Sequence, residues 1–185
     1  MGLLLSCGQQ KGHAPGRGEC KQGGGCYLFF LSGGVSGIIG TKANADSLCN
    51  SDANRPNDSE YKAVINYSDR TACTSAYCSV GGEAENVDWV LYPATAYFLK
   101  GETFLGTTNK GGVFFDLDER LASASDLQFY YMGTNENWTA HANTCTDWTT
   151  TIGSGGFGSS DDFPKVSTGG VSACSNLLTL LCAEQ

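Results

Sequence analysis

The nine cysteines are the feature that most limits what this chain of 185 residues can fold into. A zinc site would favour Cys-x-x-Cys pairs and histidines. The closest cysteines here have four and five residues between them, and the chain has two histidines. Disulfides formed in an oxidising compartment therefore explain the cysteines better than a metal does. The nine positions are Cys7, Cys20, Cys26, Cys49, Cys73, Cys78, Cys145, Cys174 and Cys182.

The end of the chain indicates how the domain closes. A short apolar run, 177–182, follows a glycine- and serine-rich segment, which is typical of a buried strand. A terminal strand stays ordered only where other elements hold it. We therefore expect Cys182 to bridge to a cysteine early in the chain, and Cys145 to join Cys174 across the loop.

The composition limits both the fold classes and the classes of partner that are expected for this chain. The 25 glycines and the low charged fraction of 16% predict one loop-rich domain with short strands. The formal net charge is -8, and the 11 basic residues are dispersed, with no two adjacent. Nucleic acid, heparin-like polymers and anionic lipid headgroups are therefore not expected as primary partners.

The N-terminus is similar to the end of a bacterial lipoprotein signal. Leucines 3–5 and Ser6 precede Cys7, although the usual basic region is absent and the apolar run is short. We expect residues 1–6 to be a signal remnant and the Cys7 thiol to carry lipid. The alternative is a free thiol. Residues 7–25 would then be a flexible tether, with the folded domain at 26–185.

Apolar runs between turn residues predict the regular elements. A helix is expected at 43–50, capped by Thr41 or Asn44. A hairpin is expected around residues 109–111, with arms at 103–106 and 112–115. Further strands are expected at 26–31, 61–66 and 127–133, with apolar patches at 88–92 and 96–99.

The residues give little support for catalysis. His13 lies in the expected tether, His141 lies in a polar turn, and no Gly-x-Ser-x-Gly motif is present. Asp161 and Asp162 are more typical of a solvated turn, or of a weak ion site, than of a hydrolytic pair. We therefore expect no enzyme activity, no metal and no cofactor.

The segment 150–170 is the predicted contact surface. It shows no regular pattern, and Phe157 and Phe163 are its large apolar side chains, beside Asp161 and Asp162. Aromatic anchors on a loop with a pinned base are typical of binding sites. Trp138 is a further candidate contact. A variable loop without a partner is the open alternative.

The chain resembles endostatin, the C-terminal domain of certain collagens, and more closely its bacterial counterparts. These are the leptospiral endostatin-like surface lipoproteins and the wider bacterial family of unknown function that includes them. The resemblance covers roughly residues 26–185, and its matching pieces occur in order. They are Ala45–Cys49, Glu60–Ile65, Asp88–Leu91, Gly106–Asn109, Tyr131–Thr134, Cys145–Thr149, Ser172–Cys174 and Leu181–Gln185.

The resemblance implies an α+β, C-type-lectin-like fold with nested bridges Cys49–Cys182 and Cys145–Cys174. Cys73–Cys78 and Cys20–Cys26 would be local additions. It also implies a monomeric, lipid-anchored module on the bacterial outer membrane that binds host extracellular-matrix proteins, plasminogen or complement regulators. A carbohydrate-binding domain and an envelope structural protein are the alternatives. The histidines and clustered arginines that give animal endostatin its zinc and heparin sites are absent, so neither activity is expected.

Overall fold

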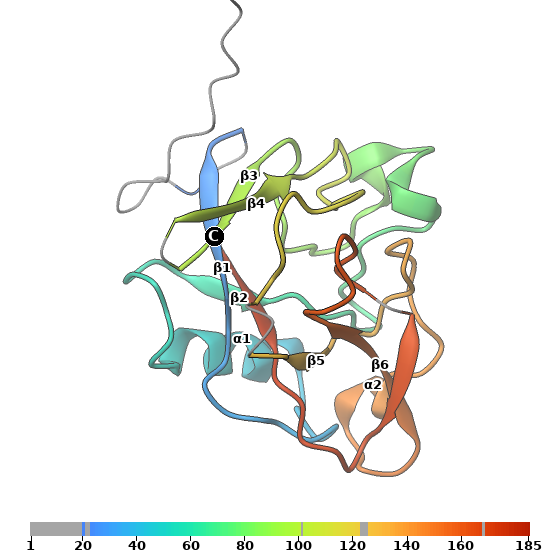
Figure 1. Ribbon diagram of the computed structural model, residues 1–185. Coiled ribbons are helices and arrows are strands. Elements are labelled where there is room, and N and C mark those ends of the chain that lie inside the picture. Colours follow the sequence, from blue (N-terminus) through green and yellow to red (C-terminus); the bar gives the residue numbers. More distant parts are fainter. Residues whose placement is uncertain (1–19, 21–22, 101, 123–125, 168) are drawn as a thin grey trace, which may run out of the picture.

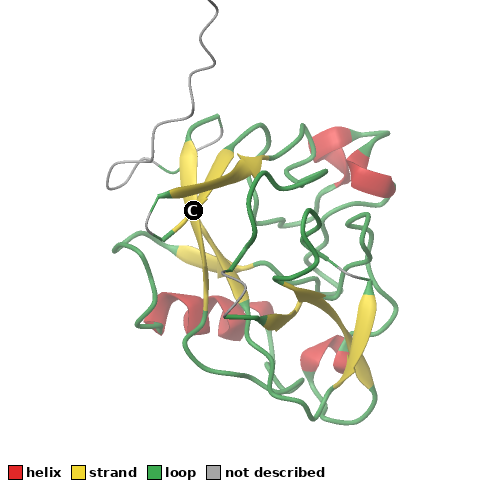
Figure 2. Ribbon diagram, viewed as in Figure 1, coloured by secondary structure: helices red, strands yellow, loops and turns green. Residues whose placement is uncertain are grey.

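The computed structural model describes residue 20 and residues 23–100, 102–122, 126–167 and 169–185. The predicted signal remnant 1–6, the lipidation site Cys7 and most of the tether 7–25 lie outside the described residues. The fold is mixed α and β, with mostly sheet and few helices (Figure 2). In the described part of the chain, no helix is both long and apolar enough to span a membrane.

The elements follow one another through the chain as short strands separated by long loops. Two 3-10 turns, Ala76–Cys78 and Gly82–Glu85, lie between the strands Tyr61–Ala63 and Ala96–Leu99. The helices and strands are β1 (Gly25–Phe30), α1 (Lys42–Ser51), β2 (Tyr61–Ala63), β3 (Ala96–Leu99), β4 (Thr103–Thr107), β5 (Phe129–Tyr131), α2 (Cys145–Trp148), β6 (Ser154–Ser159), β7 (Gly170–Ala173) and β8 (Leu181–Glu184).

The C-terminal strand lies inside the larger sheet. That sheet has the order β2-β8-β1-β3-β4, and β8 is antiparallel to both of its neighbours (Figure 1). Ala183 pairs with Leu28 on one side and with Lys62 on the other. β1 and β3 run parallel, and β4 adds to the edge in antiparallel orientation. The prediction that other elements hold the terminal strand is confirmed.

Four disulfides fasten this arrangement. Cys49 of α1 is bonded to Cys182 of β8, and Cys145 of α2 is bonded to Cys174. The short loops Cys73–Cys78 and Cys20–Cys26 are closed by the other two bridges. These are the pairs that the resemblance implied. Eight of the nine cysteines are paired in these bridges, and the ninth, Cys7, lies outside the described residues.

Helix α1 begins where its capping residue predicts. The Thr41 hydroxyl accepts a hydrogen bond from the Asn44 amide, which satisfies one of the free donors of the first turn. Inside, Asp46 accepts two 2.7 Å hydrogen bonds from the guanidinium of Arg70, whose side chain is 1% exposed. Asp46 also accepts from the Ala63 amide, so this buried ion pair joins the helix to β2.

The predicted hairpin at 103–106 and 112–115 is wrong. β4 pairs with β3 instead. Val113 and Phe114 are buried in the core, where the Phe114 ring packs edge-on against Tyr97 at 5.7 Å between centroids. The turn itself exists, since the Asn109 side chain accepts hydrogen bonds from the Gly111 and Val113 amides. Burial of Val113 and Phe114 in the core therefore takes the place of the strand pairing that was predicted for the second arm.

The glycine-rich part of segment 150–170 is a strand, which corrects the prediction of a patternless loop. β6 is the central strand of a second, antiparallel sheet of order β5-β6-β7. A Cβ added at Gly155 would lie 2.9 Å from the Trp148 ring, and one at Gly158 would lie 2.6 Å from the Tyr130 ring. The glycines therefore permit close packing against these rings. From the sequence alone, the same glycines are interpreted as a loop.

The short turn α2 is left-handed. Its four residues, Cys145 to Trp148, all have φ between 52° and 62°, a conformation that costs roughly 1–2 kcal/mol per residue for side chains other than glycine. Hydrogen bonds with neighbouring segments stabilise this left-handed conformation. The Trp148 indole donates to the Asn66 carbonyl at 2.6 Å, and Asp147 accepts from the Ser68 amide and hydroxyl.

Removal of the Cys49–Cys182 bridge should cost more stability than removal of Cys73–Cys78, because it closes a much longer loop. The bridges span 133 and 5 residues, and loop-closure entropy then gives about 5 and about 2 kcal/mol. We expect the Cys49→Ala/Cys182→Ala variant to unfold at a lower urea concentration than the Cys73→Ala/Cys78→Ala variant. Equal midpoints would show that loop closure does not govern the difference.

Candidate functional site

The turn after β6 carries one of the predicted contacts at the surface. Phe163 is 41% exposed, and the Arg120 guanidinium lies 5.9 Å from the centre of its ring. Arg120 is also ion-paired with Asp161. The Pro164 carbonyl accepts a hydrogen bond from the Leu117 amide at 2.7 Å, so the turn is fastened to the segment that carries Arg120. An aromatic ring and a charged pair therefore share one exposed position.

Phe157 does not share that turn with Phe163. It lies within β6, is half-buried, and packs edge-on against Phe129 with 5.9 Å between ring centroids. Phe129 is 44% exposed. The expectation that the two phenylalanines lie in one loop without regular structure is therefore wrong, because Phe157 lies in β6, which is paired on both sides by β5 and β7.

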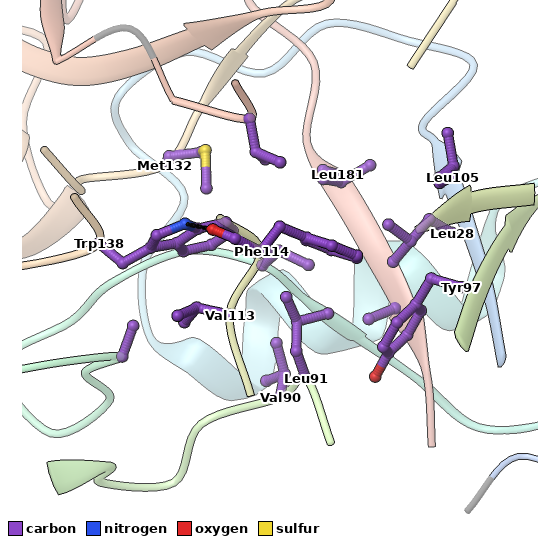
Figure 3. Close-up of a cluster of buried hydrophobic side chains, with 14 of the residues drawn as sticks. Leu28, Val90, Leu91, Tyr97, Leu105, Val113, Phe114, Met132, Trp138 and Leu181 are labelled. Atoms are coloured by element: carbon purple, nitrogen blue, oxygen red, sulfur yellow. Dashed lines mark hydrogen bonds between the residues drawn. The ribbon is translucent and has the colours of Figure 1, made fainter. Parts of the chain in front are cut away.

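Trp138 belongs to the core and is inaccessible to a partner. Its side chain is 1% exposed, and its indole nitrogen donates to the Phe114 carbonyl at 2.8 Å (Figure 3). The Trp89 ring lies edge-on 6.0 Å away. The indole thus has both its apolar packing and its hydrogen bond satisfied inside the protein. The predicted partner contact at Trp138 is corrected on this ground.

Asp162 is partly buried behind the exposed turn. One of its carboxylate oxygens is buried with no hydrogen-bond partner in the described part of the chain. Burial raises the pKa of this carboxyl, and the nearby charge of Asp161 raises it further. Across the described ranges, no group of three or more His, Cys, Asp or Glu side chains is arranged to hold a metal ion.

A pair of aromatic rings lies beside the same turn, and no local sequence pattern predicts it. The rings of Tyr77 and Phe115 are 5.0 Å apart between centroids, and Phe115 is 54% exposed. The Lys165 ammonium lies 5.4 Å from the centre of the Tyr77 ring, 2.7 Å from Asp116 and 3.0 Å from the Phe115 carbonyl. Residues nearly forty positions apart make this pair, which is why no local pattern predicts it.

The Phe163 ring and the Tyr77–Phe115 pair form one surface, because Phe163 and Lys165 are separated by a single residue in the chain. Beside it lies an open groove of about 490 Å³, whose lining includes Tyr77, Glu83, Lys110 and Phe115. A cation and an acid in contact with each other lie beside both the Phe163 ring and the Tyr77–Phe115 pair. We call this the aromatic–cation surface, and it consists of Tyr77, Phe115, Asp116, Arg120, Asp161, Phe163 and Lys165.

The loop that carries Tyr77 is held from inside by Glu85. This carboxylate is 9% exposed and accepts hydrogen bonds from the backbone or hydroxyl groups of Thr74, Ser75, Val80 and Gly81. The Gly81 amide contributes most to lowering the pKa of Glu85, to about 2, and the Ser75 hydroxyl follows. The charged form of Glu85 therefore fixes the loop.

Other bonds fix the Tyr77 backbone itself. The Tyr77 amide donates to the Asn137 carbonyl at 2.8 Å, and the Asn109 side chain donates to the Tyr77 carbonyl at 2.8 Å. Gly111 lies so close to Cys78 that an added Cβ would be 2.3 Å from the cysteine Cβ. The loop that presents Tyr77 is therefore rigid before any partner arrives.

His141 and the cysteines offer no nucleophilic pair. The Nδ1 atom of half-buried His141 accepts a hydrogen bond from the Asn143 amide at 3.0 Å. All eight described cysteines are in disulfides, so none is a thiolate. The surface gathers aromatic faces, paired charges and a polar groove.

Replacing Glu85 by Gln should destabilise the protein at neutral pH, since the amide keeps fewer acceptor sites for the same donors. The folded pKa of about 2 lies below the ordinary value of 4.5, so the carboxylate's contribution is complete above about pH 4.5 and is lost as the pH falls toward 2. The difference in unfolding free energy between the two proteins should shrink over that range. Urea titrations at several pH values measure it.

The matched control is Glu83→Gln, which removes an exposed carboxylate from the same turn. That variant should follow the wild type closely at every pH. If Glu85→Gln and the wild type differ by the same amount at pH 7 and near pH 2, the ionised carboxylate is not what holds the loop.

Comparison with known proteins gives a family but no activity. A family model described as a protein of unknown function, DUF1554, matches residues 32–162, which is more than half of the chain. No curated protein matches the chain. The matched part begins just after β1 and includes α1, the Tyr77 loop and most of the aromatic–cation surface. The chain belongs to the DUF1554 family of proteins of unknown function.

Proposed function

We propose that this chain is a non-enzymatic binding module displayed on the outside of a bacterial cell, and that its partners are host proteins. Extracellular-matrix components, plasminogen and complement regulators are the partner classes that the endostatin-like resemblance suggests. The aromatic–cation surface is the observation that carries the proposal. The contact residues Phe163 and Asp161 expected from the sequence belong to it.

The physical argument rests on preorganisation. Phe115 and Phe163 are about half exposed, and each lies in a segment held by hydrogen bonds and by a charged pair. Exposed aromatic side chains on a rigid frame bury a large apolar area while losing little conformational freedom. The nearby Lys165 and Arg120 are paired with acids, so the surface recognises a partner by shape and local polarity.

Two parts of the proposal concern architecture and location. A C-type-lectin-like, endostatin-like fold is supported by the long bridge from α1 to the terminal strand and by the second bridge Cys145–Cys174. A lipid anchor is supported by Cys7, which follows a short apolar run and is not among the eight cysteines that form the four bridges. Mass spectrometry of the mature N-terminus from a diderm host tests the anchor, and an unmodified Cys7 thiol would exclude it.

A double substitution of the exposed rings tests the binding surface. The immobilised domain is first exposed to host serum and matrix extracts, and the retained proteins are identified. For each, we expect Phe115→Ala/Phe163→Ala to weaken binding by about 2 kcal/mol or more, which is over tenfold in Kd. Phe157 is left unchanged because it is half-buried in β6.

The matched control is Val87→Ala, which removes an aliphatic side chain that is 51% exposed outside the aromatic–cation surface. It should bind as the wild type does. A folded double variant that retains wild-type affinity would place the site elsewhere on the domain.

Carbohydrate binding is the second candidate, and the groove beside Tyr77 favours it specifically. Its lining combines the Tyr77 and Phe115 rings with polar groups from Glu83, Asn109 and Lys110. Aromatic faces beside hydrogen-bonding groups suit a sugar ring. A glycan array with and without calcium, including heparin, distinguishes the candidates. Saccharide binding lost in Tyr77→Ala would support a lectin. Heparin retention at physiological salt would contradict the expectation that this acidic chain, with its dispersed basic residues, does not bind polyanions.

A further inference from the structure

Three segments at one end of the molecule contain no charged residue. They are 32–41, 149–153 and 172–178, and none includes Asp, Glu, Lys, Arg or His. The chain as a whole has 30 charged residues if its 11 basic and 19 acidic residues are taken together. The centres of protein interfaces are depleted of charged residues. Three uncharged segments that lie together in the fold would therefore form a surface typical of an interface.

The structure brings the three segments together. Val35 and Leu178 exchange backbone hydrogen bonds of 2.7 and 3.0 Å, and the Gly37 amide donates to the Cys174 carbonyl. Ile38 is bridged to Thr149. The same loops meet at the lower end of the view in Figure 1, beside α1. We call this region the charge-free face.

Large aliphatic side chains stand on the charge-free face. Ile38 is 59% exposed, Leu177 is 72% exposed and Ile152 is 82% exposed. A groove of about 420 Å³ opens between the loop 35–39 and α1, lined by Val35, Ser36, Ile38, Ile39, Asn44, Ser47 and Leu48. The face thus offers protruding aliphatic groups and a partly apolar hollow, with serine and asparagine as its polar groups.

The charged residues at the margin of this face are already paired elsewhere. Lys42 lies 2.8 Å from Asp88 and 3.1 Å from Asp69. Asp147 accepts hydrogen bonds from Ser68. Neither charge is directed to a ligand on the face. A partner with charged groups at its centre would lose their hydration there and gain no ion pair in return.

In place of the monomer expected from the sequence, we propose that the charge-free face is the contact between two copies of this chain, related by a two-fold axis. A two-fold contact places the same patch of each protomer against the other. An uncharged aliphatic patch with both protrusions and a hollow suits that arrangement, and the net charge of -8 on each copy stays away from the contact. The aromatic–cation surface uses none of these residues, so the inference is independent of the proposed function.

A bilayer is a poorer occupant of the same face. Adsorption of an acidic chain to an anionic surface requires basic residues around the apolar patch. The three segments contain none, and the nearby Lys42 is held by two aspartates. Binding to anionic vesicles that is lost in the face variants described below would therefore overturn the dimer as the purpose of this face.

Sedimentation equilibrium of the full chain carrying Cys7→Ser tests the proposal. The substitution prevents an intermolecular disulfide through the ninth cysteine. From about 1 µM to about 1 mM, a range that spans weak and moderate affinities, we expect the mean mass to rise toward that of a dimer. Added sodium chloride should leave the association unchanged or strengthen it, because no ion pair is screened.

Ile38→Asp and Leu177→Asp should each weaken the association at least tenfold, since both place a charge in the contact. Val80→Asp is the matched control, because Val80 is 88% exposed and lines the other groove. It should associate as the parent does. Circular dichroism verifies that each variant is folded. A parent that stays monomeric to about 1 mM, or face variants that associate like the parent, would overturn the proposal.

Discussion

The pairing of the last strand with two others is the constraint on which the rest of the structure depends. Ala183 of β8 pairs with Leu28 and with Lys62, so the end of the chain fills the gap between β1 and β2. The Cys49–Cys182 bridge then joins this strand to α1. All four residues of β8 are buried. Leu181 and Ala183 pack in one cluster of core side chains and Cys182 in the other, so β8 contacts both parts of the core. The sheet is therefore complete only when the final residues of the chain have joined it.

An acidic chain with few basic residues uses carboxylates as internal acceptors. Asp46 fastens α1 to β2 through Arg70 and a backbone amide. Glu85 gathers the donors of the Tyr77 loop. The fully buried Glu184 accepts hydrogen bonds from the Tyr27 amide and from the Asn57 side chain. Each carboxylate replaces several water contacts by hydrogen bonds inside the protein, which makes loops without regular structure rigid.

The two proposed contact regions differ in the chemistry of the side chains that they expose. The aromatic–cation surface presents half-exposed rings whose neighbouring charges are balanced within the protein. The charge-free face presents aliphatic groups among glycine, serine and threonine. In Figure 1 the Tyr77 loop (green) and the charge-free loops lie toward opposite ends of the molecule. A chain paired through one region therefore still exposes the other, so that two copies can present two aromatic–cation surfaces at once.

The sequence by itself determined the local features of this protein. The Thr41 cap placed α1, the dense apolar run placed β1, and cysteine spacing with the family resemblance gave the bridges that the structure contains. It also placed Phe163 and Asp161 on an exposed turn. Each of these signals is carried by neighbouring residues or by a chemistry, such as thiol pairing, that leaves few alternatives.

Only the tertiary structure decided how distant segments meet. Glycines 155, 156 and 158 suggested a loop, but close contact with rings such as Trp148 and Tyr130 makes the segment the centre of a sheet. Trp138 was a candidate contact until its packing against Phe114 showed it to be core. Packing energy depends on which side chains become neighbours in space, and a local sequence pattern does not specify partners from other elements of the fold.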